Sequence, residues 1–196
     1  MDLEEIEYKP ISIKDILKSI KDLSSLMIDL AYFAYINENK EVADLVMELE
    51  KKVDSLVYLL YMKSALFARD VEEAELSAAI IRIGSSLNEF ANAAADVANL
   101  AKIGISPHSY IKVAFEKTEE IVDDVIITLK SRLIGKRIRD LESLGIYIDI
   151  IAVRRDGKWI LNPSSDMVLM AGDTLIIRGN VEAINKFRRM AFHEGT

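Results

Sequence analysis

Residues 144–190 read LGIYIDIIAVRRDGKWILNPSSDMVLMAGDTLIIRGNVEAINKFRRM, and they contain clear signals for strands, turns and a helix. Ile146–Val153 is rich in isoleucine and valine, which is typical of a β-strand. Asp156-Gly157 comes soon after, and an Asp-Gly step predicts a tight hairpin because glycine adopts positive φ without steric cost. Lys158–Leu161 is therefore the returning strand, and Asn162-Pro163 ends it because proline cannot donate to a sheet ladder.

The second half of this stretch predicts another strand and a helix. A turn at Gly172-Asp173 precedes Thr174–Arg178, which has the branched apolar residues of a strand. Asn180 is a favoured N-cap residue, and Glu182 places a negative charge in the first helical turn. We therefore expect a helix after Asn180 whose inward face carries Ile184, Phe187 and Met190.

Six short motifs follow one another in this half of the chain: Gly135-Lys136, Leu144-Gly145, Arg154–Gly157, Asn162-Pro163, Gly172-Asp173 and Gly179. In this order they resemble the C-terminal domain of the regulator-of-potassium-conductance family, called TrkA-C, and Val125–Thr128 supplies its leading strand. The resemblance implies a small α+β domain, expected at 123–192, that pairs two-fold and holds a small regulator. The Gly-x-Gly-x-x-Gly fingerprint of the nucleotide domain that usually precedes TrkA-C is missing from the sequence.

Three arginines and an asparagine lie at the ends of the predicted strands: Arg154, Arg155, Asn162 and Arg178. The resemblance implies a ligand crevice between two such domains, where guanidinium groups and an amide would recognise an anionic group such as phosphate. We therefore predict these four residues as ligand-binding residues. The alternative is that they are strand-end charges that face water.

The N-terminal half has helical periodicity instead. Ser12 begins a capping motif, and the apolar spacing predicts helices at 12–35, 42–67 and 76–101, with a shorter one at 110–122. In the third helix the apolar residues alternate four and three apart, at 76, 80, 83, 87, 90, 94, 97 and 101. This spacing predicts the internal seam of an antiparallel bundle. Asp123-Asp124 marks the change to a strand pattern, so the bundle is expected at 11–122.

Glu50 and Asp54 are four residues apart on the second helix, which places both carboxylates on one face. With the TrkA-C-like half beside it, this pair resembles the carboxylate motif of the PhoU family; Asn92–Asp96 fits that motif less well, with Glu89 one turn earlier. The resemblance implies a divalent metal held by Glu50, Asp54, Glu89 and Asp96. The alternative is a polar rim beside the bundle seam. A PhoU unit fused to TrkA-C resembles an archaeal arrangement related to potassium channels.

Asp29 stands alone among the apolar residues of 26–36. We expect it to be buried, and a buried carboxylate is costly unless it is paired. Arg82 or a hydroxyl such as Ser24 or Ser25 is the expected partner. The alternative is a contact with a ligand.

Composition and charge exclude several classes of protein. Of 196 residues, 51% are hydrophobic, which is enough for a real core. A net charge of −7 argues against nucleic acid as a partner, because binding phosphates needs a basic surface. The absence of cysteine rules out disulfides, and two histidines cannot form a histidine-rich metal site. We expect no signal peptide, a cytoplasmic location or attachment to the membrane through a partner, and, since glutamine is also absent, a thermophilic source.

We therefore expect an α + (α+β) protein of two domains, in which an antiparallel PhoU-like bundle precedes a small TrkA-C-like sheet domain with flanking helices. The favoured function is control of a membrane cation channel or transporter, potassium in particular, by a small-molecule or ion effector. The alternative is a metal-binding adaptor in phosphate signalling; a metal-dependent phosphate-ester hydrolase ranks third. No catalytic constellation stands out in the sequence, so an enzyme is not expected. A homodimer or larger homo-oligomer is expected, and the candidate cofactors are a divalent metal and a nucleotide effector.

Overall fold

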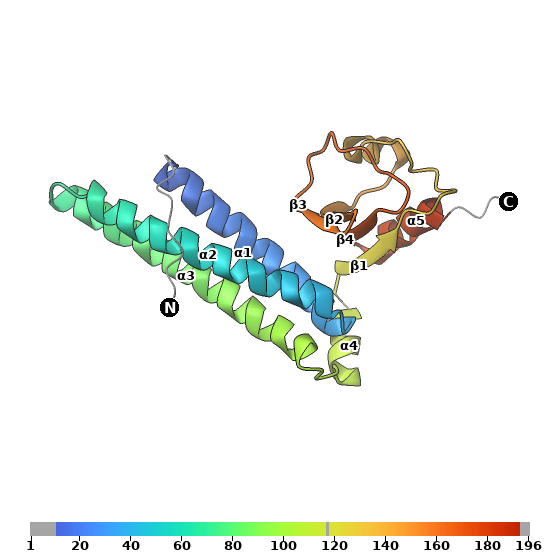
Figure 1. Cartoon of the computed structure of the whole chain (residues 1–196), viewed down its shortest axis with the longest axis horizontal. Coiled ribbons are helices and arrows are strands. Elements are labelled where there is room, and N and C mark those ends of the chain that lie inside the picture. Colours follow the sequence, from blue (N-terminus) through green and yellow to red (C-terminus); the bar gives the residue numbers. More distant parts are fainter. Residues whose placement is uncertain (1–10, 117, 193–196) are drawn as a thin grey trace. The chain divides into compact units, whose positions relative to one another are not determined.

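The computed structural model describes residues 11–116 and 118–192, and it divides into two compact units between Pro107 and His108 (Figure 1). The first unit is helical and the second contains a sheet, which confirms the predicted α + (α+β) fold class. The short helix α4 (Ser109–Glu116) belongs to the second unit. The domain limits 11–122 and 123–192 remain predictions. Among the described residues, no helix combines the length and apolarity that a membrane span requires.

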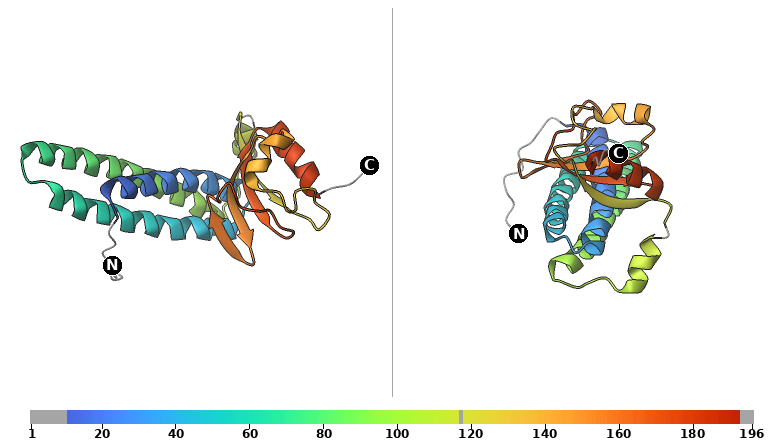
Figure 2. Two further views of the ribbon diagram at one scale, coloured as in Figure 1. Left: turned by 90° about the horizontal axis from the view of Figure 1, so that it is seen from above. Right: turned by 90° about the vertical axis from the view of Figure 1, so that its right-hand side faces the viewer.

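The first unit is a bundle of three long helices, α1 (Ile13–Ile36), α2 (Lys40–Phe67) and α3 (Val71–Lys102). Each begins after a residue whose side-chain oxygen accepts a hydrogen bond from the first helical turn: Ser12, Asn39 and Asp70. These caps satisfy backbone donors that a helix leaves free at its start. Because the connections are only a few residues long, successive helices lie side by side in opposite directions (Figure 2).

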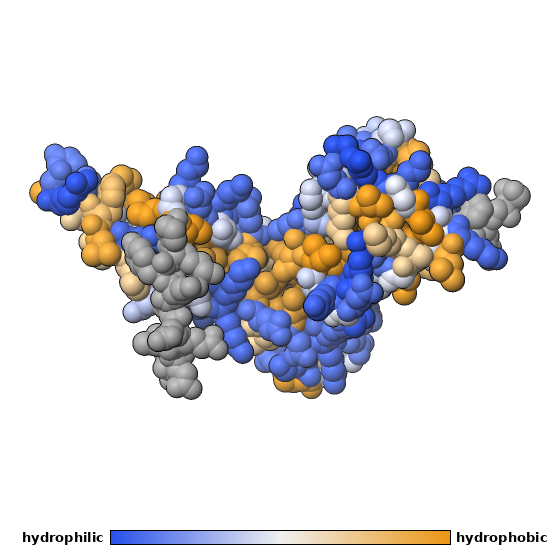
Figure 3. Space-filling view, turned by 45° about the horizontal axis from the view of Figure 1, so that its top comes forward, coloured by the Kyte–Doolittle hydropathy of each residue, from blue (hydrophilic) through white to orange (hydrophobic). Residues whose placement is uncertain are grey.

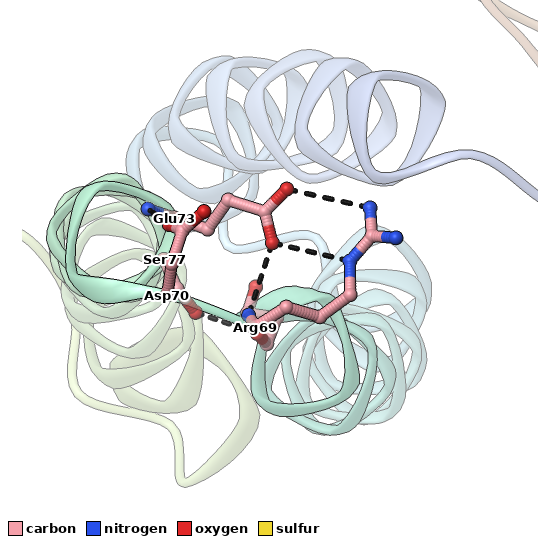
Figure 4. A network of polar contacts seen from close by, with 5 residues as sticks. Arg69, Asp70, Glu73 and Ser77 are labelled. Carbon is pink, nitrogen blue, oxygen red and sulfur yellow. Dashed lines mark hydrogen bonds and ion pairs between the residues drawn. The ribbon is translucent and has the colours of Figure 1, made fainter.

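The start of α3 is fixed by a local network (Figure 4). The carboxylate of Asp70 accepts a bond of 2.8 Å from the backbone N of Glu73, and the carboxylate of Glu73 accepts one of 3.0 Å from the backbone N of Arg69. The hydroxyl of Ser77 donates to the backbone O of Ser64 at 2.6 Å, which ties α3 to α2. Hydrogen bonds therefore hold the turn between these two helices.

Helix α3 packs into the bundle through small residues. Ser77, Gly84, Ala91 and Ala98 are spaced seven apart and all are buried. A Cβ atom at Gly84 would lie 2.3 Å from Cδ2 of Leu60, which is itself fully buried. The small side chains therefore allow the helices to approach α3 closely.

The seam predicted on α3 is wrong over its first half. Leu76, Ile83 and Phe90 are 51%, 53% and 56% exposed, whereas Ala94 and Ala101 of the same series are buried. The series one position further along, from Ser77 to Ala98, faces the interior instead. Side chains of neighbouring residues on a helix point about 100° apart, so two rows of residues that differ by one position face different sides of the helix.

The second unit contains one antiparallel sheet with the strand order β1-β4-β2-β3. Its strands are β1 (Ile121–Ile126), β2 (Asp149–Arg155), β3 (Lys158–Leu161) and β4 (Thr174–Gly179). The β2–β3 hairpin turns at Asp156 and Gly157, which both have positive φ, of 51° and 75°. This is the type of turn that the Asp-Gly step predicts.

Helix α5 (Val181–Phe192) packs on one face of this sheet. Its N-cap is Asn180 as predicted, whose side-chain oxygen accepts a bond of 2.8 Å from the backbone N of Ala183. Ile184 and Phe187 are buried in the core of this unit, together with Leu175 and Ile177 of β4. Two 3₁₀ turns, Ile138–Asp140 and Glu142–Leu144, lie in the long connection before β2.

The helix predicted at 110–122 is too long. Helix α4 ends at Glu116, and Ile121 and Val122 instead begin β1, where they pair with Gly179 and Arg178 of β4. The cause is a pairing with a distant strand, which the local sequence pattern does not contain. Branched residues such as isoleucine and valine tolerate both conformations but favour the strand.

Candidate functional site

The second unit contains a pocket of about 440 Å³. It lies where the two 3₁₀ turns, the start of β2, the loop after β3 and the end of β4 meet. Its apolar lining comes mainly from isoleucines, and its polar lining consists of Arg139, Glu142, Asp149, Asn162, Ser165 and Arg178. An apolar wall with a few polar groups is typical of a small-ligand site.

Local backbone geometry holds the loop after β3 in place. Asn162 has a φ of 44°, a left-handed conformation that asparagine tolerates better than most residues. Its backbone N donates to the backbone O of Ile151 at 3.0 Å. Pro163 follows and ends the pairing, so both residues of the predicted Asn-Pro stop line the pocket.

The opposite wall is tied to the same loop by backbone hydrogen bonds. The backbone N of Ile138 donates to the O of Met167 at 3.0 Å, and the N of Arg139 donates to the O of Ser165 at 2.9 Å. Arg139 also forms an ion pair of 2.6 Å with Asp166. The walls are therefore built by ordered backbone on both sides.

Asp149 and Arg178, which both line the pocket, form an ion pair. Sheet register places Asp149 opposite Arg178, and a terminal guanidinium nitrogen of Arg178 lies 2.7 Å from the Asp149 carboxylate. A second carboxylate, of Glu120, lies 3.9 Å from Nε of Arg178. Both acids are largely exposed, so an anionic ligand can compete with them for the guanidinium group at modest cost.

The four residues predicted to bind a ligand divide into two groups. Asn162 and Arg178 line the pocket, and Arg154 and Arg155 do not. The guanidinium of Arg155 instead donates to both carboxylate oxygens of Asp173, at 2.7 Å each, and to the backbone O of Val168 at 2.8 Å. These bonds raise the pKa of Arg155. Arg155 is therefore committed to a structural pair.

Sequence reasoning missed Arg139, Glu142 and Asp149 as pocket residues. The first two lie in the irregular connection before β2, which has no periodicity from which a position can be read. Asp149 is the first residue of β2 and offered one signal, since an acid at a strand end can pair with an arginine of the neighbouring strand.

The acidic residues predicted in the bundle come together only in part. Burial raises the pKa of Glu50, and the nearby charges of Asp54 and Asp96 raise it further. Glu89 does not contribute to this shift. Within the residues that the structure describes, no three acidic or histidine side chains are arranged to hold a metal ion. Metal binding at these positions stays a prediction.

Asp29 is half-buried, so the expectation of full burial is wrong. It shares the outward face of α1 with Ser25 and Tyr32, three or four residues away, and both of these are exposed. A three-helix bundle covers only part of the surface of each helix, so even the apolar α1 keeps one exposed side. Asp29 does have an interaction partner.

The chain consists of two units, and each of them contains a match to a family model. The family model of the PhoU domain matches residues 17–101, and that of the TrkA-C domain matches residues 124–191. Segments that match these two domain families therefore follow one another along the chain in the order predicted. Both are regulatory rather than catalytic families. A search of curated proteins gave no match.

Several solved structures are similar to the chain. The RCK_C domain dimer of S. agalactiae BusR in complex with c-di-AMP is 21% identical, with a TM-score of 0.34, over 38% of this chain and 94% of that one. BusR in complex with its busA-promotor DNA is 18% identical, with a TM-score of 0.32, over 71% and 65%. The GsuK RCK domain is 19% identical, with a TM-score of 0.31, over 55% and 24%.

The expectation that nucleic acid is excluded as a partner is contradicted. BusR, which contains an RCK_C domain, is among the similar structures and is in complex with promoter DNA. The error lay in using the net charge of −7 as a criterion. Net charge is an average over the whole surface, whereas phosphate contacts depend on where the individual lysines and arginines lie.

Proposed function

We propose that this protein is a regulator whose TrkA-C domain binds a small ligand in the pocket at Asn162 and Arg178. Its ligand state controls a membrane cation channel or transporter, in particular one for potassium, from the cytoplasmic side. The observation that supports this proposal most is the pocket itself, in a domain of a regulatory family. We propose no catalytic step for either domain.

The lining of the pocket favours a ligand with a flat apolar part and an anionic group. Its volume of about 440 Å³ falls in the range of small-molecule sites, roughly 300–1,000 Å³. Isoleucine side chains suit a ring such as a nucleobase, while Arg139 and Arg178 suit a phosphate and Asn162 offers an amide. A nucleotide combines these features.

The binding test uses the full chain and titration calorimetry. The probes are cyclic di-AMP, ATP, NAD and potassium chloride, each added separately. We expect one of the nucleotides to bind, and Asn162→Gly, which keeps the left-handed φ of the loop, to weaken that binding at least tenfold, because one polar contact to a charged group contributes about 1.5–3 kcal/mol. Arg139→Ala should weaken it as well, since it removes a guanidinium group from the lining.

Arg189→Ala is the matched control, because it removes the same charge from an exposed residue of α5 that does not line the pocket. Its affinity should equal that of the unchanged protein. Equal weakening by Arg139→Ala and Arg189→Ala would mean that only net charge matters, and the pocket would then not be the site.

The regulatory part of the proposal needs a measurement in cells. Deletion of the gene should change the rate of potassium uptake, and the intact gene should restore it. A gene carrying Asn162→Gly should fail to restore the response to the ligand while producing the same amount of protein. Unchanged potassium uptake after deletion would contradict transport control even if ligand binding had been found.

A second candidate is a metal-binding adaptor in phosphate signalling. The observation that favours it is the proximity of Glu50, Asp54 and Asp96, which raises the pKa of Glu50. Elemental analysis of the purified chain, with Glu50→Gln as its control, tests this candidate. Stoichiometric metal that is lost in the variant would support it.

A further inference from the structure

Helix α3 carries a second row of residues with seam spacing, and this row is exposed. Its members alternate three and four residues apart, and we call them the outward seam: Leu76, Ala79, Ile83, Ser86, Phe90 and Ala93. All six are exposed to solvent in the described structure. This spacing places side chains along one stripe of a helix and is the pattern by which two helices form a coiled coil.

The outward seam alternates between large and small side chains. Leu76, Ile83 and Phe90 are large, and the residues three positions after each of them are alanine, serine and alanine. If two copies of α3 lie antiparallel, one register places every large residue opposite a small one of the other copy. In that register Leu76 faces Ala93 and Ile83 faces Ser86.

A parallel pair of α3 helices would place each residue of the outward seam opposite the same residue of the other copy. Two Phe90 side chains would then crowd one layer, and two Ala79 side chains would leave a gap in the next. Crowding and cavities each destabilise a packed seam. The alternation of sizes therefore favours the antiparallel arrangement and a partner with the same sequence.

We propose that two copies of this chain associate through the outward seam of α3, with the helices antiparallel and the two-fold axis between Ile83 and Ser86. The partner is a second copy because the seam is complementary to itself in this register. No other sequence is needed to fill each layer.

The charges beside the seam contribute little net preference. The antiparallel register places Arg82 near Glu89 of the other copy, twice, which is favourable. It also places Glu75 near Asp96, twice, and these acids repel. All four residues are exposed, so both effects are weak and are screened by salt. The register is therefore determined by the packing of large side chains of one copy against small side chains of the other.

The seam alone is smaller than an interface of standard size. Its three large residues are about half exposed, and a standard interface buries about 800 Å² on each partner. The adjoining surface adds to it, because the α2–α3 hairpin extends beyond the first turn of α1 and exposes Leu66 and Val71 (Figure 2). Hydrophobic residues also reach the surface at this end of the bundle in Figure 3. Association should therefore depend on protein concentration.

The absence of cysteine from the sequence makes disulfide trapping a clean test. Two proteins, Leu76→Cys and Ala93→Cys, carry tags of different size and are mixed under mild oxidation. We expect the mixed disulfide to exceed, at least tenfold, the yield from the control pair Ala78→Cys and Asn92→Cys, which lie on α3 outside the seam and are also exposed. Leu76→Cys should not form a disulfide with itself, because residues 76 and 93 are roughly 25 Å apart along a helix.

Ile83→Asp provides an independent measurement by sedimentation. It places a charge at the centre of the seam but changes an exposed residue, so the helical circular dichroism should stay the same while the dimer is lost. A predominant Leu76→Cys self-disulfide would overturn the proposal in favour of a parallel pair. An unchanged mass for Ile83→Asp would overturn it as well. So would a mixed disulfide that forms only after removal of residues 1–10, since that segment would then be the natural occupant of the seam.

Discussion

The pair formed by Arg155 and Asp173 gives the sharpest prediction for stability. Asp173 is 1% exposed, and its carboxylate accepts bonds from Nε and a terminal nitrogen of Arg155 and from the backbone N of Met170. The substitution Asp173→Ala leaves a guanidinium group and a backbone N–H without their acceptor. It should therefore destabilise the second unit strongly.

The size of the effect follows from the burial of the two side chains. Removal of one partner from a fully buried pair costs about 3–5 kcal/mol. The side chain of Arg155 is 23% exposed, so water can solvate part of the abandoned charge. We therefore expect a loss of about 2–4 kcal/mol. The pair of Asp149 and Arg178 has the same 2.7 Å separation but is exposed, so Asp149→Ala should cost no more than about 1 kcal/mol.

The single tryptophan provides the assay. Trp159 lies in β3, so its fluorescence during urea denaturation reports on the second unit, whereas circular dichroism is dominated by the three long helices of the first. Asp173→Ala should lower the midpoint of the fluorescence transition and affect the helical transition less. Equal midpoints for Asp173→Ala and Asp149→Ala would refute the assignment of stability to burial of the pair.

Two further predictions concern the bundle. Gly84→Ala should lower its stability by up to about 2 kcal/mol, because the clash with fully buried Leu60 outweighs a gain in helix propensity of about 1 kcal/mol, and the urea midpoint of the helical signal measures this. Glu50→Gln should stabilise the protein at pH 7, because the pKa of Glu50 is raised in the folded state and its ionised form opposes folding there. That advantage should disappear as the pH falls below the ordinary carboxyl value of 4.5, where the native glutamic acid is already neutral; thermal melting across pH 4–8 would contradict the reasoning if the difference stayed constant.

The turns and the helix cap next to the strands could be predicted because the residues at those positions determine them. The positive φ values of Asp156 and Gly157 follow from the Asp-Gly step, and the cap at Asn180 follows from its own side chain. The start of β1 was not predictable, because Ile121 becomes a strand residue only by pairing with Gly179 of β4. The sequence around Ile121 contains no information about this partner, which lies 58 residues further along the chain (179 − 121).

The sequence predicts the position of a site residue only where local backbone geometry determines that position. Asn162 is placed by the Asn-Pro stop that follows β3, so its position could be inferred from sequence. Arg155 was assigned to the ligand because it lies at a strand end and the resemblance to TrkA-C implies a ligand crevice there, yet the buried carboxylate of Asp173 accepts hydrogen bonds from its guanidinium group. Which of several arginines reaches a pocket depends on where the nearest buried acid lies, and only the tertiary structure contains that information.

The two seams of α3 show why periodicity indicates a helix face but not its environment. Large residues at 76, 83 and 90 and small residues at 77, 84, 91 and 98 both repeat every seven positions, so each row alone predicts a packed interface. Hydrophobicity assigns the larger row to the interior, whereas the structure places the smaller row there. A row of glycine and alanine can face the interior because it allows helices to approach closely, as the distance between Gly84 and Leu60 requires. The large row is then left at the surface with its spacing intact, and exposed spacing of this kind has a physical use only if another helix packs against it.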